Sequence, residues 1–145
     1  MSDLLDSGPT TNFWIVGGAA LVWNLLGVVF YYQHVTMTPD ALAGFTDAQQ
    51  QFFTTMPVWA TSAHAIAVNA GVLGSLFLLL RKSWAVPLFA LSLLGVLVQN
   101  FNAFVLANGL EVWGSSGIVL PAIVIIIAVA LLVYSRGAKE KGWLV

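Results

Sequence analysis

Long apolar runs alternate with short polar segments along this chain. Four of the runs contain no Asp, Glu, Lys or Arg: residues 13–32, 58–80, 84–106 and 118–134. At a rise of 1.5 Å per residue, each run forms a helix about 25 to 35 Å long, which matches the roughly 30 Å hydrocarbon core of a bilayer. The pattern predicts an all-α protein, a bundle of four transmembrane helices in a single membrane domain, residues 1–145.

The polar segments between the runs predict how the helices connect. Residues 81–83 form so short a turn that the second and third helices must be antiparallel neighbours. The longer loop 33–57 carries two helix-start signals, Thr38 before Pro39 and a capping-box pattern of Thr46 with Gln49. Because its apolar residues share one helical face, we expect an interfacial amphipathic helix here, either one bent helix or two short ones, in preference to an irregular loop.

Charge predicts the orientation. Lys and Arg occur only at positions 81–82 and after the fourth run, whereas loops 33–57 and 107–117 carry Asp or Glu and no Lys or Arg. Basic residues favour the cytoplasmic side of a membrane. With an even number of crossings, both termini are expected in the cytoplasm.

Composition narrows the function classes. Hydrophobic residues make up 59% of the chain and charged residues 8%, whereas a soluble domain carries about 25% charged residues, so the lipid bilayer is the expected partner. A net charge of −1 gives no reason to expect nucleic acid. Without cysteine there are no disulfides and no Cys-ligated metals, and we expect no metal site and no cofactor.

Polar residues inside the runs are the candidates for function, because a bilayer interior offers a side chain no hydrogen bonds. At α-helical spacing, small residues flank Asn24 along one face of its run, and Asn69 faces nearly opposite His64 on the second run, as though that helix met two neighbours. With one carboxylate from the outer loop, the residues we single out are Asn24, His64, Asn69, Gln99, Asn102 and Glu111.

Three of these residues lie at a similar depth in the membrane. His64, Gln99 and Asn102 lie about 6 to 12 Å below the outer ends of their helices. Together with Glu111 they are expected to line a shallow polar pocket that opens outward, while Asn24 lies nearer the middle of the membrane. The alternative is that the amides and His64 simply hydrogen-bond neighbouring helices, and that Glu111 is a solvated loop carboxylate.

Several segments also resemble a known family. They are Trp23–Gly27, Val35–Pro39, Gly71–Gly95 and Gly142–Leu144, and the similarity extends over nearly the whole chain. The chain resembles a family of small four-helix proteins of the bacterial inner membrane that are loosely labelled sugar transporters. The resemblance implies a bacterial inner (cytoplasmic) membrane and four crossings, and it implies no particular chemistry.

Two functions follow as hypotheses. The first is a non-catalytic membrane protein that forms a homo-oligomer or serves as an accessory subunit beside other membrane helices. The second is a transporter or binding protein for a small neutral, sugar-like solute, because neutral amides suit a neutral ligand. An enzyme is not expected, because no carboxylate within the membrane is available to orient His64.

Overall fold

The computed structural model describes residues 8–145, all of whose regular elements are helices. In chain order these are α1 (Thr11–Val35), α2 (Pro39–Leu42), α3 (Asp47–Thr54), α4 (Val58–Leu79), α5 (Ala85–Phe101), the π-helical turn η2 (Asn102–Leu106), α6 (Gly109–Trp113), the 3-10 turn η3 (Ser115–Ile118) and α7 (Val119–Glu140).

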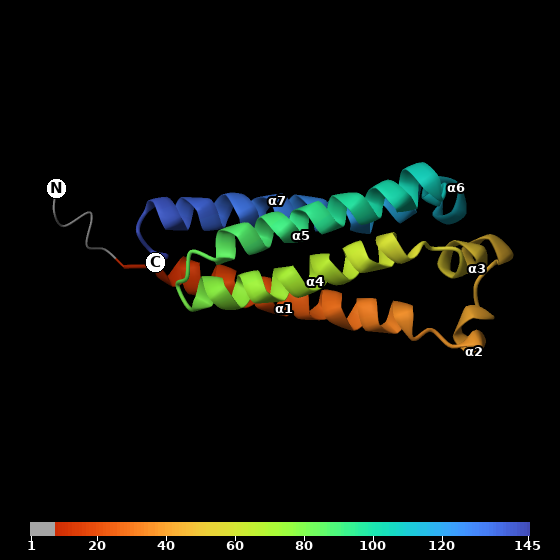
Figure 1. The fold of residues 1–145 in the computed structure, drawn as a ribbon, viewed down its shortest axis with the longest axis horizontal. Coiled ribbons are helices and arrows are strands. Elements are labelled where there is room, and N and C mark those ends of the chain that lie inside the picture. Colours follow the sequence, from red (N-terminus) through yellow and green to blue (C-terminus); the bar gives the residue numbers. More distant parts are fainter. Residues whose placement is uncertain (1–7) are drawn as a thin grey trace.

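Four helical segments are long and apolar enough to cross a membrane: residues 11–35, 58–79, 85–106 and 115–140. They run side by side along the long axis, with α2, α3 and α6 gathered at one end (Figure 1). The prediction of an all-α protein with four spans is confirmed, and the chain is an integral membrane protein. The first and fourth helices extend beyond their apolar runs, because polar residues such as His34 and Arg136 continue the helix at its end.

The helices pack in the order α1 on α4, α4 on α5, and α5 on α7. The α4–α5 contact is close because Gly95 has no side chain: a Cβ there would lie 2.7 Å from the carbonyl oxygen of Ala63 and 3.0 Å from Ala67. Gly71 likewise leaves room for the Asn24 side chain of α1. By contrast, α1 and α7 are not among the pairs that share an extensive interface within the described chain.

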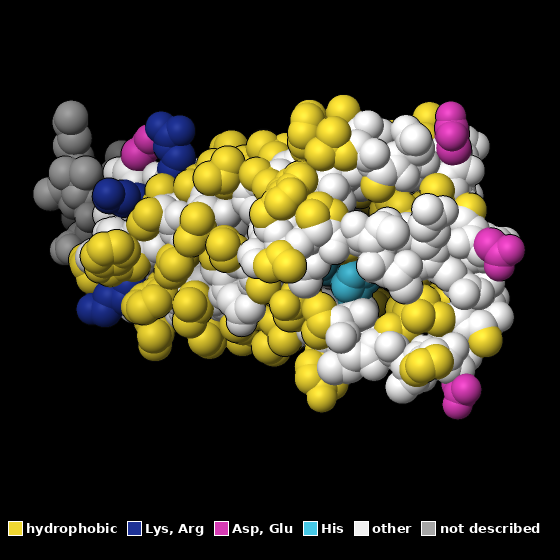
Figure 2. Space-filling view, turned by 45° about the vertical axis from the view of Figure 1, so that its right-hand side comes forward, with side chains coloured by type: hydrophobic (Ala, Val, Ile, Leu, Met, Phe, Trp, Pro, Cys, Tyr) yellow, Lys and Arg dark blue, Asp and Glu magenta, His cyan; other side chains and the backbone are white. Residues whose placement is uncertain are grey.

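Lys and Arg gather at one end of the bundle, where Glu140 lies among them, and the other acidic side chains of the described residues lie at the opposite end (Figure 2). The α4–α5 turn and the end of α7 meet at the end that we call the basic end, with Arg81, Lys82, Arg136, Lys139 and Lys141. The opposite, acidic end carries α2, α3 and α6, with Asp40, Asp47 and Glu111. This division agrees with the alternation on which the predicted orientation rests, although which end faces the cytoplasm stays a prediction.

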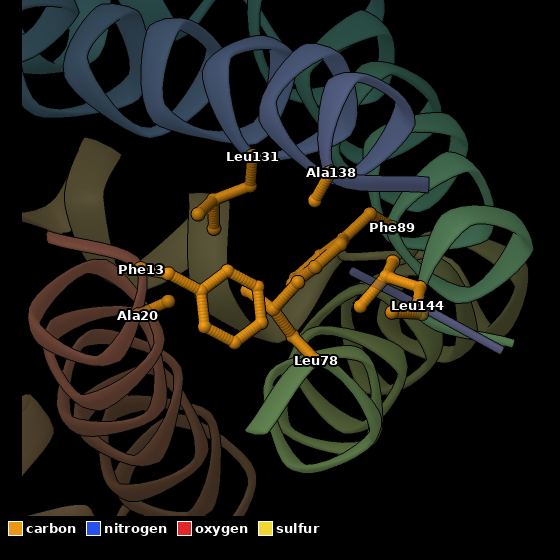
Figure 3. Close-up of a cluster of buried hydrophobic side chains, with 8 residues drawn as sticks. Phe13, Ala20, Leu78, Phe89, Leu131, Ala138 and Leu144 are labelled. Atoms are coloured by element: carbon orange, nitrogen blue, oxygen red, sulfur yellow. The ribbon is translucent and has the colours of Figure 1, made fainter. Parts of the chain in front are cut away.

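A hydrophobic core fills the half of the bundle nearer the basic end. Phe13, Leu78 and Phe89 are buried at its centre, and α7 contributes Leu131 (Figure 3). The chain after α7 folds back so that Leu144, 4% exposed, completes this core. Two backbone hydrogen bonds hold that segment to the α4–α5 turn, from Val145 N–H to Arg81 O and from Ser83 N–H to Val145 O, each 2.8 Å long.

The acidic end is built from short capped helices. Thr38 caps α2, and Thr46 and Gln49 form the capping box that begins α3. The loop therefore contains the two short helices allowed by its start signals. Their position at a membrane interface stays a prediction.

Candidate functional site

A cavity of about 300 Å³ lies among the four long helices. Its lining runs from the middle of the bundle toward the acidic end, beyond the hydrophobic core, and every long helix contributes to it. The wall is mainly apolar, with Trp23 and Phe30 from α1, Val96 from α5, and Val124 and Ile127 from α7. The polar side chains in the lining are those of Asn24, His64, Ser92, Gln99 and Asn100.

Three of these polar side chains hydrogen-bond within the bundle. Asn24 donates from Nδ2 to Ala20 O at 2.8 Å and to Ser75 Oγ at 3.2 Å, which joins α1 to α4. Ser92 Oγ donates to Ala67 O at 2.7 Å, which joins α5 to α4. Asn100 Nδ2 donates to Val96 O of its own helix at 2.8 Å. Asn24 thus hydrogen-bonds a neighbouring helix, as the alternative interpretation of the amides expects, and Ser92 forms a second bond of this kind.

His64 and Gln99 differ from these three. The Nδ1 atom of His64 is buried and has no hydrogen-bond partner, and the Gln99 side chain makes no hydrogen bond within residues 8–145. His64 is six residues from the start of α4 and Gln99 seven from the end of η2, so both lie about 10 Å from the acidic end of their helices. The buried Nδ1 atom lies out of reach of a bound molecule, whereas other atoms of the His64 ring and the half-buried Gln99 amide line the cavity.

An aromatic layer separates His64 from the acidic end. The His64 ring packs edge-on against the Tyr31 ring, with centroids 5.1 Å apart, and its centroid lies 6.2 Å from that of the His34 ring. His34 contacts Phe53 at 5.2 Å, and Phe53 contacts Trp113 of α6 at 5.6 Å. Phe45, between α2 and α3, and Phe52 of α3 complete the aromatic layer. The layer consists of Tyr31, His34, Phe45, Phe52, Phe53 and Trp113.

The structure brings together only part of the predicted pocket. Asn24, His64 and Gln99 line the cavity. Asn102 is 3% exposed but is not part of the lining. A π-helical turn begins at this residue, where Ala107 N–H bonds back five residues to Asn102 O at 2.8 Å. Asn100, which simple α-helical spacing places away from Gln99 and Asn102, lines the cavity as well.

Glu111 and Asn69 lie elsewhere. Glu111 is exposed on α6 and lines a separate groove against α3, together with Gln51, Thr55 and Asn108. Asn69 is exposed near the middle of α4, and its Nδ2 donates to Ala65 O of the same helix at 2.7 Å. The face of α4 that carries Asn69 therefore meets no other described helix at this residue, in contrast to the expectation of a neighbour on that side.

Sequence reasoning missed the contribution of Tyr31 and His34. Their positions at the end of an apolar run indicate interfacial anchoring, and the contact with His64 depends on how α1 leans on α4. The two residues are three apart, hence on one helical face, which is the one signal that could have grouped them. The two histidines approach each other, yet among the described residues no group of three or more His, Cys, Asp or Glu could hold a metal ion.

Comparison of the chain with known protein families, with curated proteins and with solved structures finds no match. The resemblance to small four-helix inner-membrane proteins therefore stays a prediction.

Proposed function

We propose that this is a non-catalytic integral membrane protein that binds a small neutral molecule in the cavity among its four long helices. The observation that carries the proposal is a cavity of about 300 Å³ whose lining includes His64 and Gln99, two polar side chains that make no hydrogen bond within residues 8–145. Ligand pockets are typically about 300 to 1,000 Å³ in volume, mostly apolar, with a few polar groups that fix the ligand.

The lining favours a neutral ligand. Among residues 8–145, no Asp, Glu, Lys or Arg lines this cavity, and a charge moved from water into such a site without a partner is strongly destabilised. The volume corresponds to about ten water-sized groups, which is one ring with a short substituent. The filled hydrophobic core below the cavity supports binding over an open channel, so transport of a neutral solute would require a second conformation.

Binding is tested by thermal unfolding of the purified protein in lipid nanodiscs with cyclohexanol and with glucose as neutral probes. A ligand that binds the folded state raises the midpoint as its concentration passes the dissociation constant. We expect cyclohexanol to raise it, and His64→Leu, Gln99→Leu and the cavity-filling Ala128→Trp to abolish the rise. Gln33→Leu, at an exposed residue outside the cavity, is the matched control. If neither cyclohexanol nor glucose changes the unfolding midpoint of the unaltered protein, the proposal is overturned.

Self-association is the second candidate, and Asn69 is the observation that favours it. This exposed amide lies in the middle of a helix that we place in the bilayer, where its remaining donor and acceptor have no water. An amide is self-complementary, so two copies facing each other across a two-fold axis could exchange two hydrogen bonds. Association with an accessory partner would use the same face.

Energy transfer between labelled copies in vesicles tests this second candidate. Interhelical hydrogen bonds average about 0.6 kcal/mol, so loss of two in Asn69→Leu should weaken association roughly eightfold. Val129→Leu on the exposed side of α7 is the control. An unchanged affinity in Asn69→Leu would exclude this face. We place the basic end in the cytoplasm of a bacterial cell, as the positive-inside rule predicts.

A further inference from the structure

The exposed part of the cavity rim lies on two helices. On α1, Leu26 and Phe30 line the cavity and are 49% and 61% exposed, and on α7 Leu120 lines it and is 59% exposed. Lining residues of α4 and α5 such as Ala67 and Val96 are buried. Since α1 and α7 are also the neighbours without an extensive interface, the cavity opens sideways between them, through a flank of the bundle that faces the hydrocarbon of the bilayer.

In contrast to the side opening, the two ends of the bundle offer a solute from water no open path to the cavity. The aromatic layer covers His64 from the acidic end, through Tyr31 and His34, and the layer continues by way of Phe53 to Trp113. The hydrophobic core closes the path from the basic end, where Phe13, Leu78 and Phe89 are all at most 1% exposed. A solute dissolved in water would have to displace packed rings, whereas a molecule dissolved in the bilayer meets the opening directly.

The arrangement of polar and apolar groups fits an amphiphile. His64 and Gln99 lie toward the acidic end, about 10 Å below the ends of their helices, and the opening between α1 and α7 is apolar. A lipid in the nearer leaflet has its head on the same side. At that depth the head must be weakly polar, such as a hydroxyl, because the bilayer interior disfavours charge.

We propose that the ligand is a single-chain neutral amphiphile that enters sideways from the bilayer between α1 and α7. Its hydroxyl or carbonyl head binds His64 and Gln99, and its chain leaves through the gap past Leu26 and Leu120. About 300 Å³ holds the head and the first carbons, and the rest of the chain remains in lipid. This inference rests on the proposed binding function and adds the class of ligand and the route.

The test uses a photoactivatable probe, dodecanol with a diazirine near its hydroxyl end, in vesicles of palmitoyl-oleoyl phosphatidylcholine that contain the full chain. After irradiation, mass spectrometry locates the label. We expect saturable labelling of the α4 peptide around His64 and of the α5 peptide around Gln99, which excess plain dodecanol suppresses. Labelling of the outer helix faces should be weaker and should not saturate.

Two variants on one helix separate the cavity from the surface. Ala128 lines the cavity and Ala130 is exposed on the same helix, so Ala128→Trp should reduce the saturable labelling at least fivefold and Ala130→Trp should leave it unchanged. Equal labelling in the two variants, or labelling that plain dodecanol does not suppress, would overturn the proposal.

The two assays together distinguish failure of the amphiphile proposal from failure of the binding function. If cyclohexanol stabilises the protein through His64 and Gln99 but dodecanol does not label the cavity, the cavity binds small solutes and the amphiphile proposal fails alone. If neither probe reaches the cavity, the binding function fails with it. Both variants are first checked for helicity and for a cooperative thermal transition. Should Ala128→Trp not fold, competition by plain dodecanol in the unaltered protein decides between saturable and surface labelling.

Discussion

The contact between α4 and α5 depends on Gly95, and Gly95→Ala tests how tightly the two helices are held. A Cβ at this position would lie 2.7 Å from the carbonyl oxygen of Ala63 and 3.0 Å from the backbone nitrogen and the Cβ of Ala67. Non-bonded carbon atoms prefer about 3.5 to 4.0 Å. The obstructing atoms belong to backbone and to a Cβ, so no side-chain rotation relieves the clash, and the helices must separate by roughly 1 Å to restore ordinary contact.

Separation has a second consequence one turn away. Ser92 Oγ donates to Ala67 O at 2.7 Å across the same interface, and an increase of about 1 Å takes this bond beyond the range of a good hydrogen bond. Overpacking costs about 1 to 3 kcal/mol. The substitution also gains about 1 kcal/mol of helix propensity, which must be subtracted with a control.

Gly18→Ala and Gly137→Ala supply that control, because both glycines are helical and a Cβ there would meet nothing within 4 Å. We expect Gly95→Ala to have a free energy of unfolding about 1 to 3 kcal/mol below that of the controls, measured by SDS titration in mixed micelles with far-UV circular dichroism. A Gly95→Ala protein as stable as Gly18→Ala would show that α4 and α5 do not pack as closely as described.

Three further predictions concern the core, the Asn24 bond and the orientation. Leu144→Ala should lower the free energy of unfolding by about 2 to 5 kcal/mol, since it removes a buried side chain, whereas Val145→Ala, at a 75% exposed residue, should change it by less than about 0.5 kcal/mol; equal effects in the same titration would refute the docking of this segment. Asn24→Ala should cost no more than about 1.7 kcal/mol, because Ser75 Oγ keeps its bond to Gly71 O, and a larger loss would mean that the amide has partners beyond Ser75 and Ala20. In this cysteine-free chain, a membrane-impermeant maleimide should label Asp47→Cys in intact spheroplasts and Lys139→Cys only after permeabilisation; labelling of both from one side would contradict four crossings.

The sequence was sufficient for the four spans because about 20 apolar residues without charge have few other uses. It also predicted the paired capping signals of α2 and α3, since Thr38 and Thr46 act on backbone groups within four residues of themselves. Such features depend on interactions between residues that are close in the sequence, so they can be predicted from the sequence alone.

The candidate site could be predicted only in part, because it depends on relations between helices. That Asn24 and His64 line one cavity follows from how α1 and α5 pack on α4, and the side opening follows from the lack of an extensive α1–α7 interface. Helical spacing places Asn102 on the face of Gln99, whereas in the structure Asn102 is buried outside the cavity lining. Likewise, the spacing of Asn69 shows that it faces away from His64 but not whether another helix lies there.

A cavity that binds a ligand from the bilayer is tested most directly by an experimental density map of the protein, purified in nanodiscs with lipids of its host membrane. We predict elongated non-protein density between α1 and α7, with one end within hydrogen-bonding distance of His64 Nε2 and the Gln99 amide. A map in which α1 and α7 close on each other and their side chains fill the cavity would contradict this prediction.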